Sequence, residues 1–178
     1  MKYKSKSQKR IDFIDLISEA ITHDDIFGTI NYKNQNEDQI KQFIYPHLVD
    51  SLAEYVVEEK GIEKAIAKDQ IKKSLKWEGN VNTTVNHILF MGTQNRPDMV
   101  LEMNGLKIAI EFKRGGKGSD LRSGFGQSMV YATHYDFVLY LFVDTTDDKR
   151  ILNATGGGNE TEFVDNLWDL YNIKFIVV

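Results

Sequence analysis

Hydrophobic and polar positions form their clearest pattern between residues 96 and 113. Two mainly apolar runs, 99–103 and 106–112, flank the pair Asn104-Gly105. This pair predicts a β-hairpin closed by a two-residue type I′ turn, because that turn needs a positive φ at both positions. The turn also fixes which residues of the two strands lie opposite each other, because side chains alternate between the two faces.

The predicted register gives the hairpin one apolar face and one face with charges at its open end. The apolar face predicts a core and carries Met99, Leu101, Met103, Leu106, Ile108, Ile110 and Phe112. On the other face Asp98 lies opposite Glu111, and Lys113 points to the same side two residues further on.

The rest of the chain predicts helices on both sides of this hairpin. Helical spacing of apolar residues predicts helices over about 8–27, from Asn36 onward, and over 62–77, 120–134 and 160–172. Runs rich in apolar and β-branched residues predict strands over 81–90, 137–143 and 174–178. The order predicts an α/β fold, a central mixed β-sheet flanked by helices.

Three residues refine the helix predictions. Asn36 is expected to cap the second helix, with Gln39 as its capping-box partner. Pro46 lies inside that helix and is expected to kink or break it. In the last helix, we expect the apolar side chains of Phe163, Leu167 and Leu170 to face inward.

The facing pair of carboxylates is the chemically unusual feature. Directly opposed side chains lie about 5 Å apart between Cβ atoms, and two charges there repel by roughly 3–4 kcal/mol at an effective dielectric near 20. Either a proton or a cation between them relieves this repulsion. Two carboxylates and a lysine on one face could hold a hard divalent cation, a water and a phosphate.

At these residues the sequence resembles the PD-(D/E)xK nuclease superfamily. Pro97-Asp98 and Glu111-Phe112-Lys113 stand in the order of its core motif, and Gln127 and Tyr131 are similar to the QxxxY motif of RecB-type and type I restriction subunit nuclease domains. The resemblance implies a restriction-endonuclease-like core over 36–146. Within a single domain of 1–178, residues 1–35 would form a helical extension and 147–178 a C-terminal helix and strand.

The resemblance also implies roles for the site residues. Asp98 and Glu111 would hold Mg²⁺ (or Mn²⁺) with the Phe112 carbonyl as an extra ligand, and Lys113 would position the attacking water. Gln127 and Tyr131 would support the lysine and contact the DNA backbone. Glu37 is either a third metal-associated carboxylate or an acid that stabilises the first turn of its helix.

Composition narrows the chemistry. The 178-residue chain has no cysteine, which excludes disulfides and thiolate metal sites. Its net charge of −4 does not itself indicate nucleic-acid binding, but residues 107–122 hold five basic and two acidic side chains. Arg114, Lys117 and Arg122 are therefore predicted to contact phosphates.

Together these features predict a Mg²⁺-dependent nuclease acting on DNA, of a restriction, defence or repair type. Two alternatives stay open: an RNase, and a non-catalytic module of the same fold that binds nucleic acid or protein. A homodimer or partner subunits are equally compatible with the sequence. The longest apolar run, Phe137–Val143, is far too short to span a bilayer and no signal peptide is evident, so we expect a cytoplasmic protein away from membranes.

Overall fold

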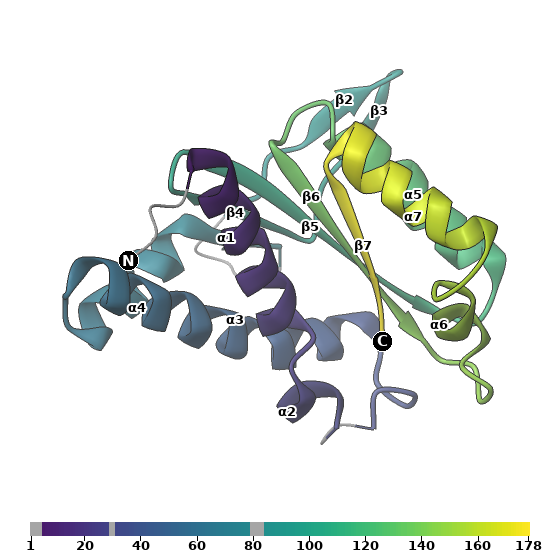
Figure 1. Ribbon diagram of the computed structural model, residues 1–178, viewed down its shortest axis with the longest axis horizontal. Coiled ribbons are helices and arrows are strands. Elements are labelled where there is room, and N and C mark those ends of the chain that lie inside the picture. Colours follow the sequence, from purple (N-terminus) through teal and green to yellow (C-terminus); the bar gives the residue numbers. More distant parts are fainter. Residues whose placement is uncertain (1–4, 29–30, 79–83) are drawn as a thin grey trace.

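A five-stranded mixed sheet forms the centre of the molecule (Figure 1). The computed structural model describes residues 5–28, 31–78 and 84–178. The sheet has the order β1-β4-β5-β6-β7, in which the first three strands are antiparallel neighbours and the last three are parallel. Its strands are β1 (Leu75–Trp77), β4 (Met99–Met103), β5 (Leu106–Gly115), β6 (Phe137–Asp144) and β7 (Ile173–Val177). The predicted α/β class, a mixed sheet flanked by helices, is confirmed.

Helices cover both faces of this sheet, as Figure 1 shows. One face packs against α1 (Lys6–Ile21), α3 (Glu37–Lys60) and α4 (Lys64–Ser74). The other packs against α5 (Gly118–Tyr131) and α7 (Asn159–Tyr171). Two short helices, α2 (Asp24–Phe27) and α6 (Arg150–Ala154), and a separate hairpin of β2 (Ile88–Phe90) and β3 (Thr93–Asn95) complete the described elements.

The β4–β5 hairpin has the predicted turn and register. Asn104 and Gly105 have φ values of 55° and 71°, as a type I′ turn requires. The paired residues run from Met103 opposite Leu106 to Met99 opposite Ile110. The apolar face lies in the larger core cluster with α1, α3 and α4, and Met103 packs against that cluster half-buried.

Helix α3 begins where the sequence predicts. The Asn36 side chain accepts a hydrogen bond from the Gln39 backbone N–H at 2.9 Å, and the Gln39 side chain accepts one from the Asn36 N–H at 2.8 Å. This is the expected capping box. The helix then runs through Pro46 to Lys60, so the proline does not break it.

Several predicted boundaries were wrong. The expected helix over 8–27 is two helices, because the chain leaves helical geometry at Thr22. The expected helix over 62–77 stops at Ser74, and β1 follows because pairing with the free edge of β4 overrides the helical pattern. Helix α5 begins and ends two to three residues earlier than the predicted 120–134.

Two further elements differ from the expectation. Within the predicted strand 81–90, residues 81–83 lie outside the described part and only Ile88–Phe90 is a strand. In α7, Leu167 is buried as predicted, but Phe163 and Leu170 are 49% and 67% exposed. Helix α7 packs beside the edge strand β7, and Phe163 contacts only the rim of the core through the Phe125 ring, 5.2 Å between centroids. Among the described residues, no helix combines the length and apolarity needed to cross a membrane.

Helix α5 approaches the sheet closely at Gly124. A Cβ built on Gly124 would lie 2.2 Å from the Tyr140 ring and hydroxyl, whereas one on Gly126 would meet nothing within 4 Å. The Tyr140 hydroxyl donates to the Leu121 carbonyl at 3.0 Å, which holds the ring in this position. Only glycine at position 124 therefore permits the observed spacing between α5 and β6.

We predict that Gly124→Ala lowers the free energy of unfolding by about 1–3 kcal/mol, because overpacking must displace α5 or Tyr140. Gly126→Ala is the matched control on the same helix and should raise it by up to about 1 kcal/mol through helix propensity. Urea unfolding followed by circular dichroism measures both. Equal effects of the two substitutions would contradict the close packing.

Candidate active site

Asp98 lies immediately before β4 and joins three elements. Its Oδ2 accepts a hydrogen bond from the Phe112 backbone N–H of β5 at 2.8 Å. Its Oδ1 accepts one from Lys41 Nζ of α3, also at 2.8 Å. The residue is only 6% exposed. Beyond the last β4–β5 pair, the Asp98 side chain therefore accepts the Phe112 N–H in place of a backbone carbonyl.

Glu111 lies on β5 beside this aspartate and is 1% exposed. Its Oε1 accepts from Lys113 Nζ at 2.8 Å. Its Oε2 is buried and has no hydrogen-bond partner in the protein. A buried carboxylate oxygen without a donor is costly, because nothing replaces the water it has lost.

Glu37 reaches the same place from the first turn of α3. Its Oε1 lies 3.8 Å from Lys113 Nζ, and its side chain is about one-third exposed. Helix α3 thus presents Glu37 and, one turn later, Lys41 towards the end of the β4–β5 hairpin. The expected repulsion between Asp98 and Glu111 is met by two separate lysines, Lys41 and Lys113, one bonded to each carboxylate.

Burial and mutual charge raise the proton affinity of the acids. Burial, reinforced by the charge of Asp98, raises the pKa of Glu111 to about 7 against the opposing effect of Lys113. Burial also raises the pKa of Glu37, again against the charge of Lys113. Burial alone would lower the pKa of Lys113, but the carboxylates of Glu111, Glu37 and Asp98 together outweigh it and raise that pKa.

Tyr131 and Gln127 reach the site from α5, one turn apart. The buried Tyr131 hydroxyl donates to the Arg96 carbonyl at 2.9 Å and so fixes the segment that leads into Asp98. Burial and the charges of Glu111 and Asp98 raise the pKa of Tyr131 above its usual range, which keeps the phenol protonated as a donor. Gln127 is half-buried, and its Oε1 has no hydrogen-bond partner in the protein.

The three predicted phosphate contacts differ in exposure. Lys117 and Arg122 are exposed at the start of α5. Arg114 is half-buried, and its Nη2 donates to the Lys33 carbonyl at 2.9 Å. A fourth basic side chain joins them, since Arg150 Nη2 donates to the Gly116 carbonyl at 2.6 Å. No sequence pattern indicated Arg150, because α6 brings it to this loop from 34 positions away.

Lys41 is the site residue that sequence reasoning missed. It is buried, with its ammonium 2.8 Å from Asp98 Oδ1 and 2.9 Å from Asp38 Oδ1. A signal was present, because position 41 falls on the same helical line as Glu37, Ile44 and Leu48. A lysine on a line of buried positions needs a buried acid as its partner.

The oxygens at this end of the hairpin suit a hard divalent cation such as Mg²⁺ or Mn²⁺. Within the described ranges, no group of three or more His, Asp or Glu side chains is arranged to hold a metal ion. However, Glu111 Oε2 makes no hydrogen bond, because the nearby Tyr131 hydroxyl donates to the Arg96 carbonyl instead. The Phe112 carbonyl points to the same edge of β5 as the N–H from which Asp98 accepts. Together with the second lone pair of an Asp98 oxygen, these are the oxygens that could hold such an ion.

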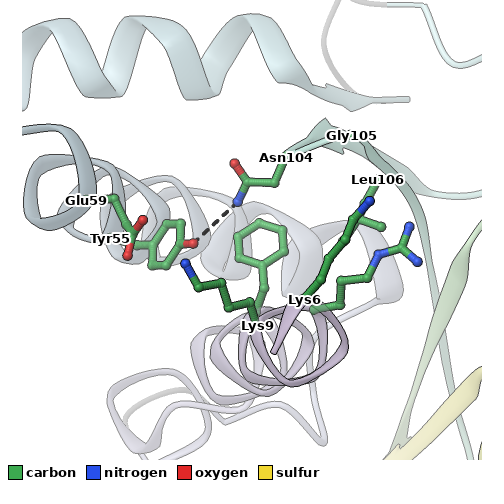
Figure 2. Close-up of a pocket in the computed structure, with 9 residues that line it drawn as sticks. Lys6, Lys9, Tyr55, Glu59, Asn104, Gly105 and Leu106 are labelled. Atoms are coloured by element: carbon green, nitrogen blue, oxygen red, sulfur yellow. Dashed lines mark hydrogen bonds between the residues drawn. The ribbon is translucent and has the colours of Figure 1, made fainter. Parts of the chain in front are cut away.

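A distinct pocket lies at the other end of the hairpin, beside the Asn104-Gly105 turn (Figure 2). It has a volume of about 290 Å³ and is lined by the basic first turns of α1 and by Tyr55, whose hydroxyl accepts from Asn104 Nδ2 at 3.4 Å. None of the carboxylates described above lines it. The candidate site is therefore identified by its chemistry rather than by this hollow.

Comparisons of the chain with protein-family models, with curated proteins and with solved structures found no match.

We predict that Glu111 makes the metal-free protein less stable as pH rises from about 4.5 to about 7. Across this window the folded protein keeps a proton on Glu111 that the unfolded chain has released, so the free energy of unfolding falls with rising pH. The total effect is on the order of a few kcal/mol. Glu111→Gln should remove it.

Urea unfolding of both proteins in EDTA at several pH values between 4 and 8 measures this contribution, because titrating groups that do not interact with Glu111 cancel in the difference. Parallel stability curves would show that Glu111 titrates near its ordinary value.

Proposed function

We propose that this chain is a metal-dependent phosphodiesterase that cleaves DNA on a restriction-endonuclease-like core. One observation carries the proposal: Asp98 and Glu111 are buried together at the end of the β4–β5 hairpin, and Glu111 keeps one oxygen without any hydrogen bond. Folding alone does not favour this arrangement, since an apolar residue at position 111 would avoid the cost of a buried, half-satisfied carboxylate. A bound divalent cation would repay that cost.

Each site residue would have a separate role in cleavage. Asp98, Glu111 and the Phe112 carbonyl would hold Mg²⁺ or Mn²⁺. Glu37 would accept a hydrogen bond from a water bound to that ion. The ion would polarise the scissile phosphate and lower the pKa of its bound water. Lys113, bonded to Glu111, would orient the attacking water and stabilise charge that develops on the phosphate.

Other residues support this centre. Tyr131 holds the segment before Asp98 through the Arg96 carbonyl, and the unpartnered Gln127 Oε1 is available to a water. Lys117 and Arg122 are exposed on the same loop and helix that follow Lys113, where they would contact the phosphate backbone. An enzyme of this kind, acting on genomic or invading DNA, would work in the cytoplasm.

We predict that Asp98→Asn and Glu111→Gln each reduce cleavage at least about 100-fold, because each removes a charged ligand worth several kcal/mol of transition-state stabilisation. Both substitutions keep the shape, and asparagine still accepts from the Phe112 N–H. The assay uses supercoiled, linear and single-stranded DNA, and RNA, each with Mg²⁺, with Mn²⁺ and with EDTA.

Glu102→Gln is the matched control, because Glu102 lies on the same hairpin in an exposed pair with Lys76 at 3.0 Å. It should cleave at the wild-type rate. Cleavage by Glu111→Gln, or cleavage in EDTA, would reject the metal site, and cleavage confined to RNA would correct the substrate.

We further predict that Lys117→Ala/Arg122→Ala flattens the slope of log K against log salt for duplex binding by roughly two, because each phosphate contact releases about one counterion. The loss should be similar on unrelated sequences, since these side chains contact phosphates rather than base edges. Binding is measured in Ca²⁺. The control pair, Lys72→Ala/Lys73→Ala, lies on α4 at the opposite face and should leave the slope unchanged. A loss confined to one sequence would contradict this role.

A further inference from the structure

We propose that Lys41 fills a second cation position in this site, so that the protein binds one divalent ion and not two. The inference rests on the proposed function and gives Lys41 a defined part in it. Lys41 acts through Asp98 and is therefore a positioning residue.

The ammonium of Lys41 bridges two carboxylates. It lies 2.8 Å from Asp98 Oδ1 and 2.9 Å from Asp38 Oδ1, and the side chain is 5% exposed. A divalent ion can also be held between two carboxylates, with shorter distances from the ion to the oxygens. Lys41 thus occupies the place that an ion shared by Asp38 and Asp98 would take.

On the side that faces α3, the Asp98 carboxylate is already bonded to a cation. Oδ2 accepts from the Phe112 N–H, and Oδ1 accepts from Lys41. Two-metal sites place their ions about 3.5–4 Å apart, so a shared carboxylate must offer an oxygen to each. A second ion at Asp98 would have to displace Lys41 from Oδ1.

The outer side of Lys41 borders open space. A hollow of about 280 Å³ is lined by Asp38, Lys41, Gln42, Trp77 and Glu78. An ion at the Lys41 position could therefore complete its coordination with waters from this hollow. What excludes the second ion is the charge of Lys41 rather than a lack of room.

The charges of the site agree with a single ion. The four carboxylates of Glu37, Asp38, Asp98 and Glu111 face the two ammonium groups of Lys41 and Lys113, which leaves a charge of −2 when all are ionised. One divalent ion neutralises this set. Without the charge of Lys41 the set would carry −3, which favours a second cation.

Calorimetric titration with Mn²⁺ in the absence of DNA tests the proposal. We expect one ion per chain in the wild type, two in Lys41→Gln, and one in Lys41→Arg, which keeps the charge. The Hill coefficient for Mn²⁺ in DNA cleavage should rise from about 1 to about 2 in Lys41→Gln. Lys68→Gln, which alters an exposed pair of α4 and α3 with 2.6 Å between Lys68 and Asp50, is the control and should keep one ion.

Two ions in the wild type, or one ion in a folded Lys41→Gln protein, would overturn the proposal. A lysine that served only to stabilise the fold would change the melting temperature in Lys41→Gln without changing the number of ions. If Lys41→Gln does not fold, the wild type decides: one ion with a Hill coefficient near 1 supports the proposal, and two ions reject it. A wild type that binds one ion but cleaves no nucleic acid would reject the proposed function alone.

Discussion

The hydrogen bond between Asp98 and the Phe112 N–H is the interaction on which the rest of the site depends. Strand β4 begins at Met99, opposite Ile110, so β5 continues past it without a backbone partner on that side, and a side chain must accept the Phe112 N–H. The same carboxylate bonds Lys41 and so ties α3 to the end of the hairpin. Sheet, helix and candidate site are joined at one residue, because a buried N–H needs an acceptor and a buried ammonium needs an acid.

The two halves of the site are supported from opposite faces of the sheet. Helix α3 contributes Glu37 and Lys41 and belongs to the larger core cluster, while α5 contributes Gln127 and Tyr131 from the other face. Because the acids lie at the end of the hairpin, past the last β4–β5 pair, residues from both layers can reach them. This explains how a site that needs lysines, carboxylates, an amide and a phenol is built within a few strands.

The parts of this fold that could be predicted were those determined by short-range physics. The Asn104-Gly105 turn fixed the hairpin register, and Asn36 with Gln39 fixed the start of α3, because each depends only on neighbouring residues. The partners of Asp98 could not be predicted, since Lys41 lies 57 positions away and reaches it through packing of α3 on the sheet. Strand β1 was missed for the same reason: its conformation comes from the edge of β4 rather than from its own sequence.

The double use of Asp98 has an evolutionary consequence. If the proposed function holds, a descendant of this chain that had lost it would still need an acceptor at position 98, because the Phe112 N–H would otherwise be buried and unpaired. Selection for folding alone would thus preserve the first half of the motif. Glu111 is different, since one of its oxygens bonds nothing in the protein. Among related sequences, the residue at position 111 would separate active from inactive copies better than the more familiar Pro-Asp pair.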